Sequence, residues 1–258
     1  DQIPRLLTMI GSTLAGKKLI EHSSTSVKRF SLELGGDAPV LVFDDAELDT
    51  AVADIVGLKL ANAGQICVAP NRVFVHASIY ESFLEKAKVL MESYRYLGET
   101  GEGPELSPVC TESSIEKMVN FCRPDSHGGT VVTGGKRADR AGYFLEPTLI
   151  KDVDRNSKLT CEEIFGPILP VMPFSDEEDI FAIANDTAYG LSAYVYTQNL
   201  NRALEAEKRL LFGNILINEA HYSVQLPHGG LKQSGSGKDV SRIALDDYYD
   251  IKRISIKR

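Results

Sequence analysis

The chain has 258 residues, of which 43% are hydrophobic, so it can bury a large core without disulfides or metal ions. Its 28 basic and 36 acidic residues give a formal charge of -8, which disfavours nucleic acid and anionic membrane surfaces as partners. No apolar run approaches the roughly 20 residues that span a bilayer, and the first residues lack the pattern of a secretory signal. We expect a soluble, cytoplasmic protein.

Short runs rich in β-branched and aromatic residues alternate with amphipathic segments along the chain. Strands are expected at residues 6–10, 40–43, 72–76, 169–174, 192–196 and 214–218. Helices are expected around Leu19 and Ile20, at residues 48–60, between Ile79 and Tyr94, and at residues 176–185 and 200–210. This alternation predicts an α/β fold with a largely parallel sheet.

The ends of two elements carry more specific signals. Asp44 and Asp45 are expected to cap the helix at residues 48–60, which should stop near the asparagine and glycine at 62 and 64. Near the C-terminus, residues 251–256 alternate between apolar and polar side chains, as a strand does. That strand is either an ordinary sheet edge or a subunit contact.

The four cysteines are widely spaced, with no Cys-x-x-Cys pair and no histidine at zinc-finger spacing. They are Cys67, Cys110, Cys122 and Cys161. We therefore expect reduced thiols and no metal centre. Taken singly, each cysteine is most simply a small buried hydrophobe.

One pair of residues has the chemistry of a covalent active site. Glu33 lies in the glycine-hinged turn at residues 32–36, and Cys67 ends the loop at residues 63–67. A cysteine can attack a carbonyl, and a glutamate can activate the water that releases the product. A free thiol of pKa ~8.5 is mostly protonated near pH 7, so the site must lower that pKa or deprotonate the thiol transiently. Alone, Glu33 also fits a solvated carboxylate at a strand end.

A second signal precedes Glu33. Gly11, Ser12 and Gly16 lie where the strand at residues 6–10 turns into a helix, a place where backbone amides can approach a phosphate group. The spacing is neither a full dinucleotide fingerprint nor a P-loop, so a plain strand-to-helix turn is the alternative.

Six short motifs together resemble the C-terminal half of an NAD(P)-dependent, non-acylating aldehyde dehydrogenase. In family order they lie at residues 11–13, 32–36, 64–67, 162–167, 213–215 and 227–235. The resemblance covers essentially the whole chain. It implies a remnant of the dinucleotide-binding domain at residues 1–33, a catalytic domain at residues 34–240, and a tail with an oligomerisation strand at residues 241–258.

The resemblance also implies roles for individual residues. Cys67 falls on the family nucleophile and Glu33 on the general base. The residues implied to bind NAD or NADP are Gly11, Ser12, Gly16, Leu34, Glu163 and Phe165. Glu163 would accept hydrogen bonds from a ribose diol, and Phe165 would pack against a ring. The expected reaction oxidises a small aldehyde to a carboxylic acid, in a full-length protein that forms a homo-oligomer, a dimer or a tetramer.

Two further expectations follow from the resemblance. The family's oxyanion asparagine and most of its dinucleotide domain lie upstream of where this chain starts, so the polypeptide alone should have little dehydrogenase activity. A non-catalytic scaffold or a residual thiol esterase is the alternative function. The motif at residues 227–230, together with Gly237, Lys238 and Asp239, is similar to the aminobutyraldehyde-oxidising branch, while semialdehyde and lactaldehyde dehydrogenases also resemble the chain. Glu219 and Tyr222 fall in the segment that lines the substrate entrance in the family.

Overall fold

A seven-stranded sheet forms the centre of the computed structural model, which describes residues 1–257. In spatial order its strands are β12 (Asn214–Ile217), β11 (Ser192–Tyr196), β3 (Ala38–Val42), β4 (Pro70–His76), β9 (Ile168–Phe174), β8 (Thr148–Lys151) and β7 (Thr130–Thr133). Every neighbouring pair is parallel except β7 with β8. The predicted α/β fold with a largely parallel sheet is confirmed.

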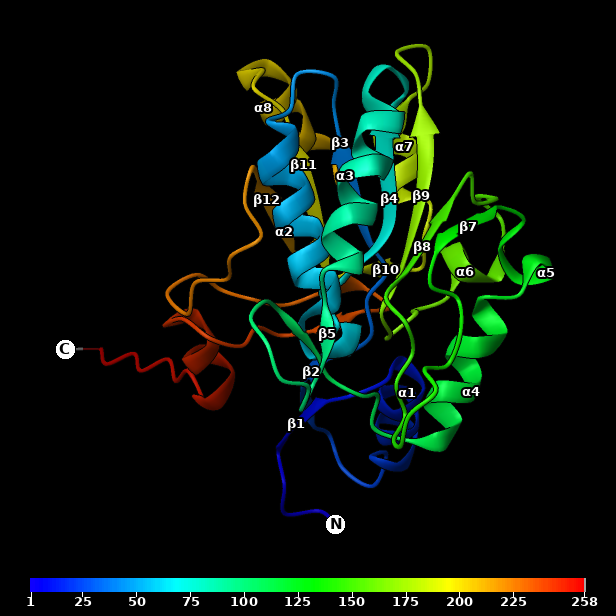
Figure 1. Cartoon of the computed structure of the whole chain (residues 1–258). Coiled ribbons are helices and arrows are strands. Elements are labelled where there is room, and N and C mark those ends of the chain that lie inside the picture. The colour runs from blue at the N-terminus through cyan, green and yellow to red at the C-terminus, as the bar shows by residue number, and fades with distance from the viewer. Residues whose placement is uncertain (258) are drawn as a thin grey trace.

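Helices cover both faces of this sheet (Figure 1). On one face lie α2 (Leu48–Leu60) and α3 (Tyr80–Glu92), and on the other lie α7 (Ile180–Asn185) and α8 (Leu200–Arg209). The chain moves in one direction through β3, α2 and β4 and in the opposite direction through β9, α7 and β11. Because parallel crossovers are right-handed, this reversal puts the two helix pairs on opposite faces.

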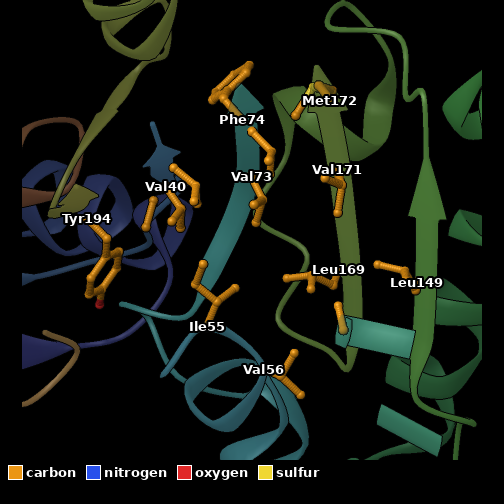
Figure 2. Close-up of a cluster of buried hydrophobic side chains, with 14 of the residues drawn as sticks. Val40, Ile55, Val56, Val73, Phe74, Leu149, Leu169, Val171, Met172 and Tyr194 are labelled. Atoms are coloured by element: carbon orange, nitrogen blue, oxygen red, sulfur yellow. The ribbon is translucent and has the colours of Figure 1, made fainter. Parts of the chain in front are cut away.

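The sheet and its helices bury one continuous apolar core. Figure 2 shows Val40, Val73 and Val171 on adjacent strands, close to Ile55 and Val56 of α2. These side chains are at most 1% exposed. Burial of this kind stabilises by about 1.5–3 kcal/mol for each large aliphatic side chain, so the sheet is a rigid frame for the loops at its ends.

A second sheet of three strands lies below the large one. In it β1 (Leu6–Ile10) pairs in parallel with β2 (Arg29–Glu33), and β14 (Gly235–Ser236) pairs antiparallel with β2. Between β1 and β2 runs α1 (Thr13–His22). Glu33 is the last residue of β2 and lies opposite Gly235, so both partner strands fix its backbone.

The remaining elements are short and lie around these two sheets. They are the helices α4 (Glu112–Phe121), α5 (Pro124–His127) and α6 (Lys158–Cys161), the 3-10 helices Ala61–Gly64, Ala77–Ile79 and Ile243–Tyr248, and the strands β5 (Arg95–Tyr96), β6 (Glu105–Leu106), β10 (Tyr189–Gly190) and β13 (Leu231–Lys232). Within residues 1–257, no helix is long and apolar enough to cross a membrane.

Two local expectations were wrong, and the first of them concerns the start of α2. Glu47, not Asp44 or Asp45, occupies the N-cap of α2, because Arg202 binds both aspartates and Thr197 binds Asp45.

Residues 251–257 form no strand, because no described sheet edge supplies the backbone partners that a strand needs. Residue 258, the last of the expected tail, lies outside the described residues. The expected subunit contact stays a prediction.

Candidate active site

The candidate site lies at the amino-terminal ends of three adjacent parallel strands. The Glu33 turn leads into β3, the Cys67 loop leads into β4, and the loop with Glu163 leads into β9. Because β3, β4 and β9 are neighbours in the sheet, three loops that are far apart in the sequence meet at one edge. Glu33, Cys67 and Glu163 are thereby brought together.

The Cys67 loop is shaped by an abrupt end to α2. Asn62, Ala63 and Gly64 all have positive φ, at 49°, 53° and 72°. A side chain at Gly64 would lie 2.2 Å from the carbonyl oxygen of Gly166, so this turn packs directly on the loop before β9. The turn sends the next residues to Cys67, which is partly buried.

The Glu33 turn approaches the Cys67 loop just as closely. A Cβ added at Gly36 would lie 2.1 Å from the carbonyl oxygen of Cys67, so only glycine fits there. The glycine at position 36 therefore allows the Glu33 turn and the Cys67 loop to pack against each other, in addition to allowing the chain to bend.

A buried ion pair ties the three loops together. The Asp37 carboxylate is paired with Arg72 at 3.0 Å, and Asp37 is 1% exposed. The same carboxylate accepts hydrogen bonds from Asn71 at 2.6 Å and from Thr187 at 2.8 Å. Asn71 also donates to the carbonyl of Glu162 and accepts from the amide of Ile164. Asn71 and Arg72 thus support the geometry of the site.

Glu33 is only 5% exposed, and neither of its carboxylate oxygens has a hydrogen-bond partner among the described residues. Burial is the main cause that raises the pKa of Glu33 to about 7, a value that also includes a rise from the negative charge of Asp239 and an opposing effect of Lys238. The nearest basic atom is Nδ1 of His228, 3.5 Å from Oε2. The solvated-carboxylate alternative for Glu33 is wrong, since the side chain is buried and its pKa suits a general base near neutral pH.

The environment of Cys67 does not lower its pKa. Burial, together with the negative charges of Glu163 and Glu33, raises the pKa of the thiol to about 11. Of the two routes to a thiolate that the sequence leaves open, a lowered pKa is wrong for this structure. Transient deprotonation remains, and Glu33 is a nearby carboxylate with a suitable pKa.

Glu163 faces inward toward the Glu33 turn. Its Oε1 accepts a hydrogen bond from the amide of Gly36 at 3.0 Å, and burial raises its pKa. Lys59 is fully buried beneath it, and its pKa falls to about 7 because burial outweighs the attraction of Asp37 and Glu163. Phe165 has a positive φ of 55° and is 42% exposed, so its ring is available to a ligand.

The other predicted cofactor residues lie around the start of α1. The amide of Gly11 donates to the carbonyl of Glu33 at 3.0 Å, and the Ser12 side chain caps α1 by accepting from the amide of Ala15. Gly11 and Ser12 are exposed, whereas Gly16 is buried against the side chain of Leu34. Gly11 and Ser12 thus lie at an open helix N-terminus, while Gly16 and Leu34 join that helix to the Glu33 turn.

A pocket of about 390 Å³ reaches His228, the neighbour of Glu33. Its lining includes Glu219, Tyr222, His228 and Asp239. Behind the pocket, the Tyr222 hydroxyl lies 2.6 Å from that of Ser192 and 3.0 Å from that of Tyr194, both of which are buried.

Several residues of the site have no motif of their own in the sequence. Asp37, Lys59 and Tyr194 were not predicted, and Asp239 and His228 were noted only within a resemblance. Asp37 did leave a signal, because it is a charged residue directly before the fully buried strand β3. Lys59 left none, since its position on α2 is that of any lysine near a helix end.

Comparison with known proteins shows which family this fold and site belong to. The model of the aldehyde dehydrogenase family matches residues 1–254. The chain belongs to the aldehyde dehydrogenase family. The mitochondrial succinate-semialdehyde dehydrogenase of Arabidopsis thaliana is 39% identical over 254 residues, 98% of this chain and 48% of that protein. The NADP(+) succinate-semialdehyde dehydrogenase of Escherichia coli is 39% identical over 258 residues, 99% of this chain and 54% of that protein.

Solved structures agree with the sequence comparison. An NADP dependent enzyme of E. coli superimposes with a TM-score of 0.91 at 40% identity, over 96% of this chain and 52% of that one. A lactaldehyde dehydrogenase gives 0.89 at 36% identity, over 94% and 52%. This chain spans about half the length of the relatives it matches.

The buried carboxylate of Glu33 should make the thermal stability of the fold depend on pH. A glutamate that binds its proton more tightly when folded destabilises the fold as pH rises from its unfolded pKa of 4.5 to about 7. Glu33→Gln should therefore leave the melting temperature at pH 4 nearly unchanged and raise it at pH 8. The rise should be at least roughly 2–4 °C, because that is the effect of about 1 kcal/mol in a chain of this size and the pKa shift corresponds to more than this.

Circular dichroism melts at the two pH values measure this difference. Glu219→Gln is the control, because Glu219 is exposed in the same region. An equal gain for Glu33→Gln at pH 4 and pH 8 would contradict the assignment of a buried, ionising Glu33.

Proposed function

We propose that this chain carries the reacting groups of an enzyme that oxidises a small aldehyde to a carboxylic acid with NAD or NADP. The observation that carries the proposal is the convergence of Glu33, with a pKa of about 7, and Cys67 at one sheet edge. In this proposal, residues 1–33 of the chain belong to the dinucleotide-binding domain and residues 34–240 to the catalytic domain.

Cys67 attacks the carbonyl carbon of the aldehyde. Because its pKa is about 11, the thiol is protonated at rest, and ionised Glu33 accepts its proton as the carbon–sulfur bond forms. The carbonyl oxygen becomes an oxyanion, which backbone amides near Cys67 stabilise. The product of this step is a thiohemiacetal.

Loss of hydride converts the thiohemiacetal into a thioester. When bound, NAD or NADP supplies the acceptor for that hydride. Glu33 releases the proton of Cys67 to solvent and, ionised again, accepts a proton from water as the water oxygen attacks the thioester carbon. The carbon–sulfur bond breaks, the acid leaves, and the Cys67 sulfur regains a proton.

The residues present fit the cofactor at two places. Phe165 offers an exposed ring, and the neighbouring Glu163 has a carboxylate of which Gly36 binds one oxygen, leaving Oε2 for a ribose hydroxyl. Gly11 and Ser12 lie at the exposed N-terminus of α1, where amides can receive phosphate oxygens. Gly16 and Leu34 contact each other and so hold α1 against the Glu33 turn.

Ester hydrolysis tests the two reacting groups without a cofactor. The 258-residue polypeptide should hydrolyse p-nitrophenyl acetate, with formation of p-nitrophenol followed by its absorbance. Cys67→Ala should abolish this activity, and Glu33→Gln should lower its rate about 10²-fold, a typical contribution of a general base. Cys110→Ala is the matched control, because Cys110 is an exposed thiol with no part in the proposed reaction.

The polypeptide covers about half the length of its relatives. We propose that it alone reduces NAD or NADP only weakly when an aldehyde is added. The absorbance of the reduced cofactor at 340 nm measures this activity. Ester hydrolysis that survives Cys67→Ala would contradict the proposed nucleophile. It would favour the other candidate, a scaffold that keeps the fold without the chemistry.

The charge of the pocket bears on the substrate. Its described lining includes the carboxylates of Glu219 and Asp239 and contains no lysine or arginine. An acidic lining attracts a cationic group and repels a carboxylate. We propose that a cationic aminoaldehyde fits this chain better than the anionic semialdehydes named for its relatives.

Protection of Cys67 from iodoacetamide measures this preference, because a thiohemiacetal hides the thiol. 3-Aminopropanal should protect at a lower concentration than butanal, and butanal at a lower concentration than succinate semialdehyde. Glu219→Gln should reduce the differences between the concentrations at which the three aldehydes protect Cys67. Strongest protection by succinate semialdehyde would contradict the assignment.

A further inference from the structure

Three possible metal ligands from distant parts of the chain converge at the mouth of the site. They are a carboxylate oxygen of Glu33, Nδ1 of His228 and a carboxylate oxygen of Asp239, all within 4.8 Å of one another. Nδ1 of His228 lies 2.8 Å from Oδ1 of Asp239 and 3.5 Å from Oε2 of Glu33. The proposed reaction uses only Glu33 of the three.

The state of Glu33 sets this cluster apart from an ordinary group of surface charges. Glu33 is 5% exposed, and both of its oxygens lack a hydrogen-bond partner among the described residues. A buried ionised carboxylate without a partner is costly, and a cation relieves that cost. The nearby amine of Lys238 donates to the carbonyl of Gly229 at 3.2 Å. The strongest unmet demand in the cluster is therefore for positive charge at Glu33.

The spacing of the ligand atoms suits a transition metal. Zinc binds imidazole nitrogen and carboxylate oxygen at about 2.0–2.2 Å, so tetrahedral ligand atoms lie about 3.3–3.6 Å apart. The separation of His228 from Glu33 already has this value, and the shorter contact between His228 and Asp239 needs to open by about half an ångström. One imidazole with two carboxylates favours Zn²⁺ over Mg²⁺ and Ca²⁺, which prefer oxygen alone.

We propose that Glu33, His228 and Asp239 bind a divalent transition-metal ion such as Zn²⁺, and that the bound ion inhibits the chain by occupying Glu33. Coordination takes the lone pair with which Glu33 accepts a proton. Binding itself is independent of the reaction, whereas the inhibition rests on the proposed function of Glu33 as the base.

Calorimetric titration of the chain with ZnCl₂ tests the binding. Because thiolates also bind zinc, the host is a variant with Cys67, Cys110 and Cys161 replaced by serine. We expect one equivalent to bind. His228→Phe and Asp239→Asn should each weaken binding at least about ten-fold. His221→Phe is the matched control, since His221 lines the same pocket outside the cluster and should leave the affinity unchanged.

Circular dichroism spectra establish that each variant is folded. Loss of the bound equivalent in the serine host, or full affinity in both the His228 and the Asp239 variants, would overturn the proposed site.

Inhibition is read from p-nitrophenyl acetate hydrolysis by the chain with Cys67 intact. Zinc should reduce the rate at least about ten-fold, and His228→Phe should remove this zinc sensitivity. Equal inhibition of the His228 variant would assign the effect to zinc on the Cys67 sulfur and overturn inhibition through Glu33. If the chain shows no ester hydrolysis without zinc, the proposed function fails, while the titration still decides the site.

Discussion

The buried ion pair between Asp37 and Arg72 is the constraint on which the site depends. Asp37 follows the Glu33 turn, Arg72 and Asn71 follow the Cys67 loop, and Asn71 reaches the loop with Glu163. A buried pair of charges tolerates little displacement, because separating the partners leaves an uncompensated charge. The pair therefore fixes three loops to one another, and the parallel sheet behind them supplies the rigid support.

This fixed geometry forces negative groups together. Glu33 and Glu163 both lie near the Cys67 sulfur, and each raises the pKa of the thiol. The resting state is therefore a protonated thiol beside a carboxylate that ionises near pH 7. An arrangement of this kind keeps the nucleophile unreactive until a substrate arrives and the proton can move to Glu33. The buried charge of Glu33 is also the basis of the proposed cation site with His228 and Asp239.

Much of the fold was predictable because its strands are short apolar runs and its helices have one apolar face. The bounds of β1, α2 and β11 agree with those expected from the sequence. Glu33 and Cys67 were singled out in the sequence by a glycine turn and a loop cysteine, and the structure brings the two residues together, while their roles stay a proposal. Asp37 and Lys59 were not singled out, because their roles come from contacts between loops. The C-terminal strand failed because alternation alone supplies no pairing partner.

The proposed chemistry depends on Glu33 being a buried carboxylate that ionises near neutral pH in the folded chain. Carbon-13 NMR of the glutamate side-chain carboxyl groups measures this directly, with Glu33→Gln identifying the signal. We expect a titration midpoint of about 7 that stays well above 4.5 in Cys67→Ser, because burial is the main cause of the raised pKa. A midpoint near 4.5 in the folded chain would contradict it.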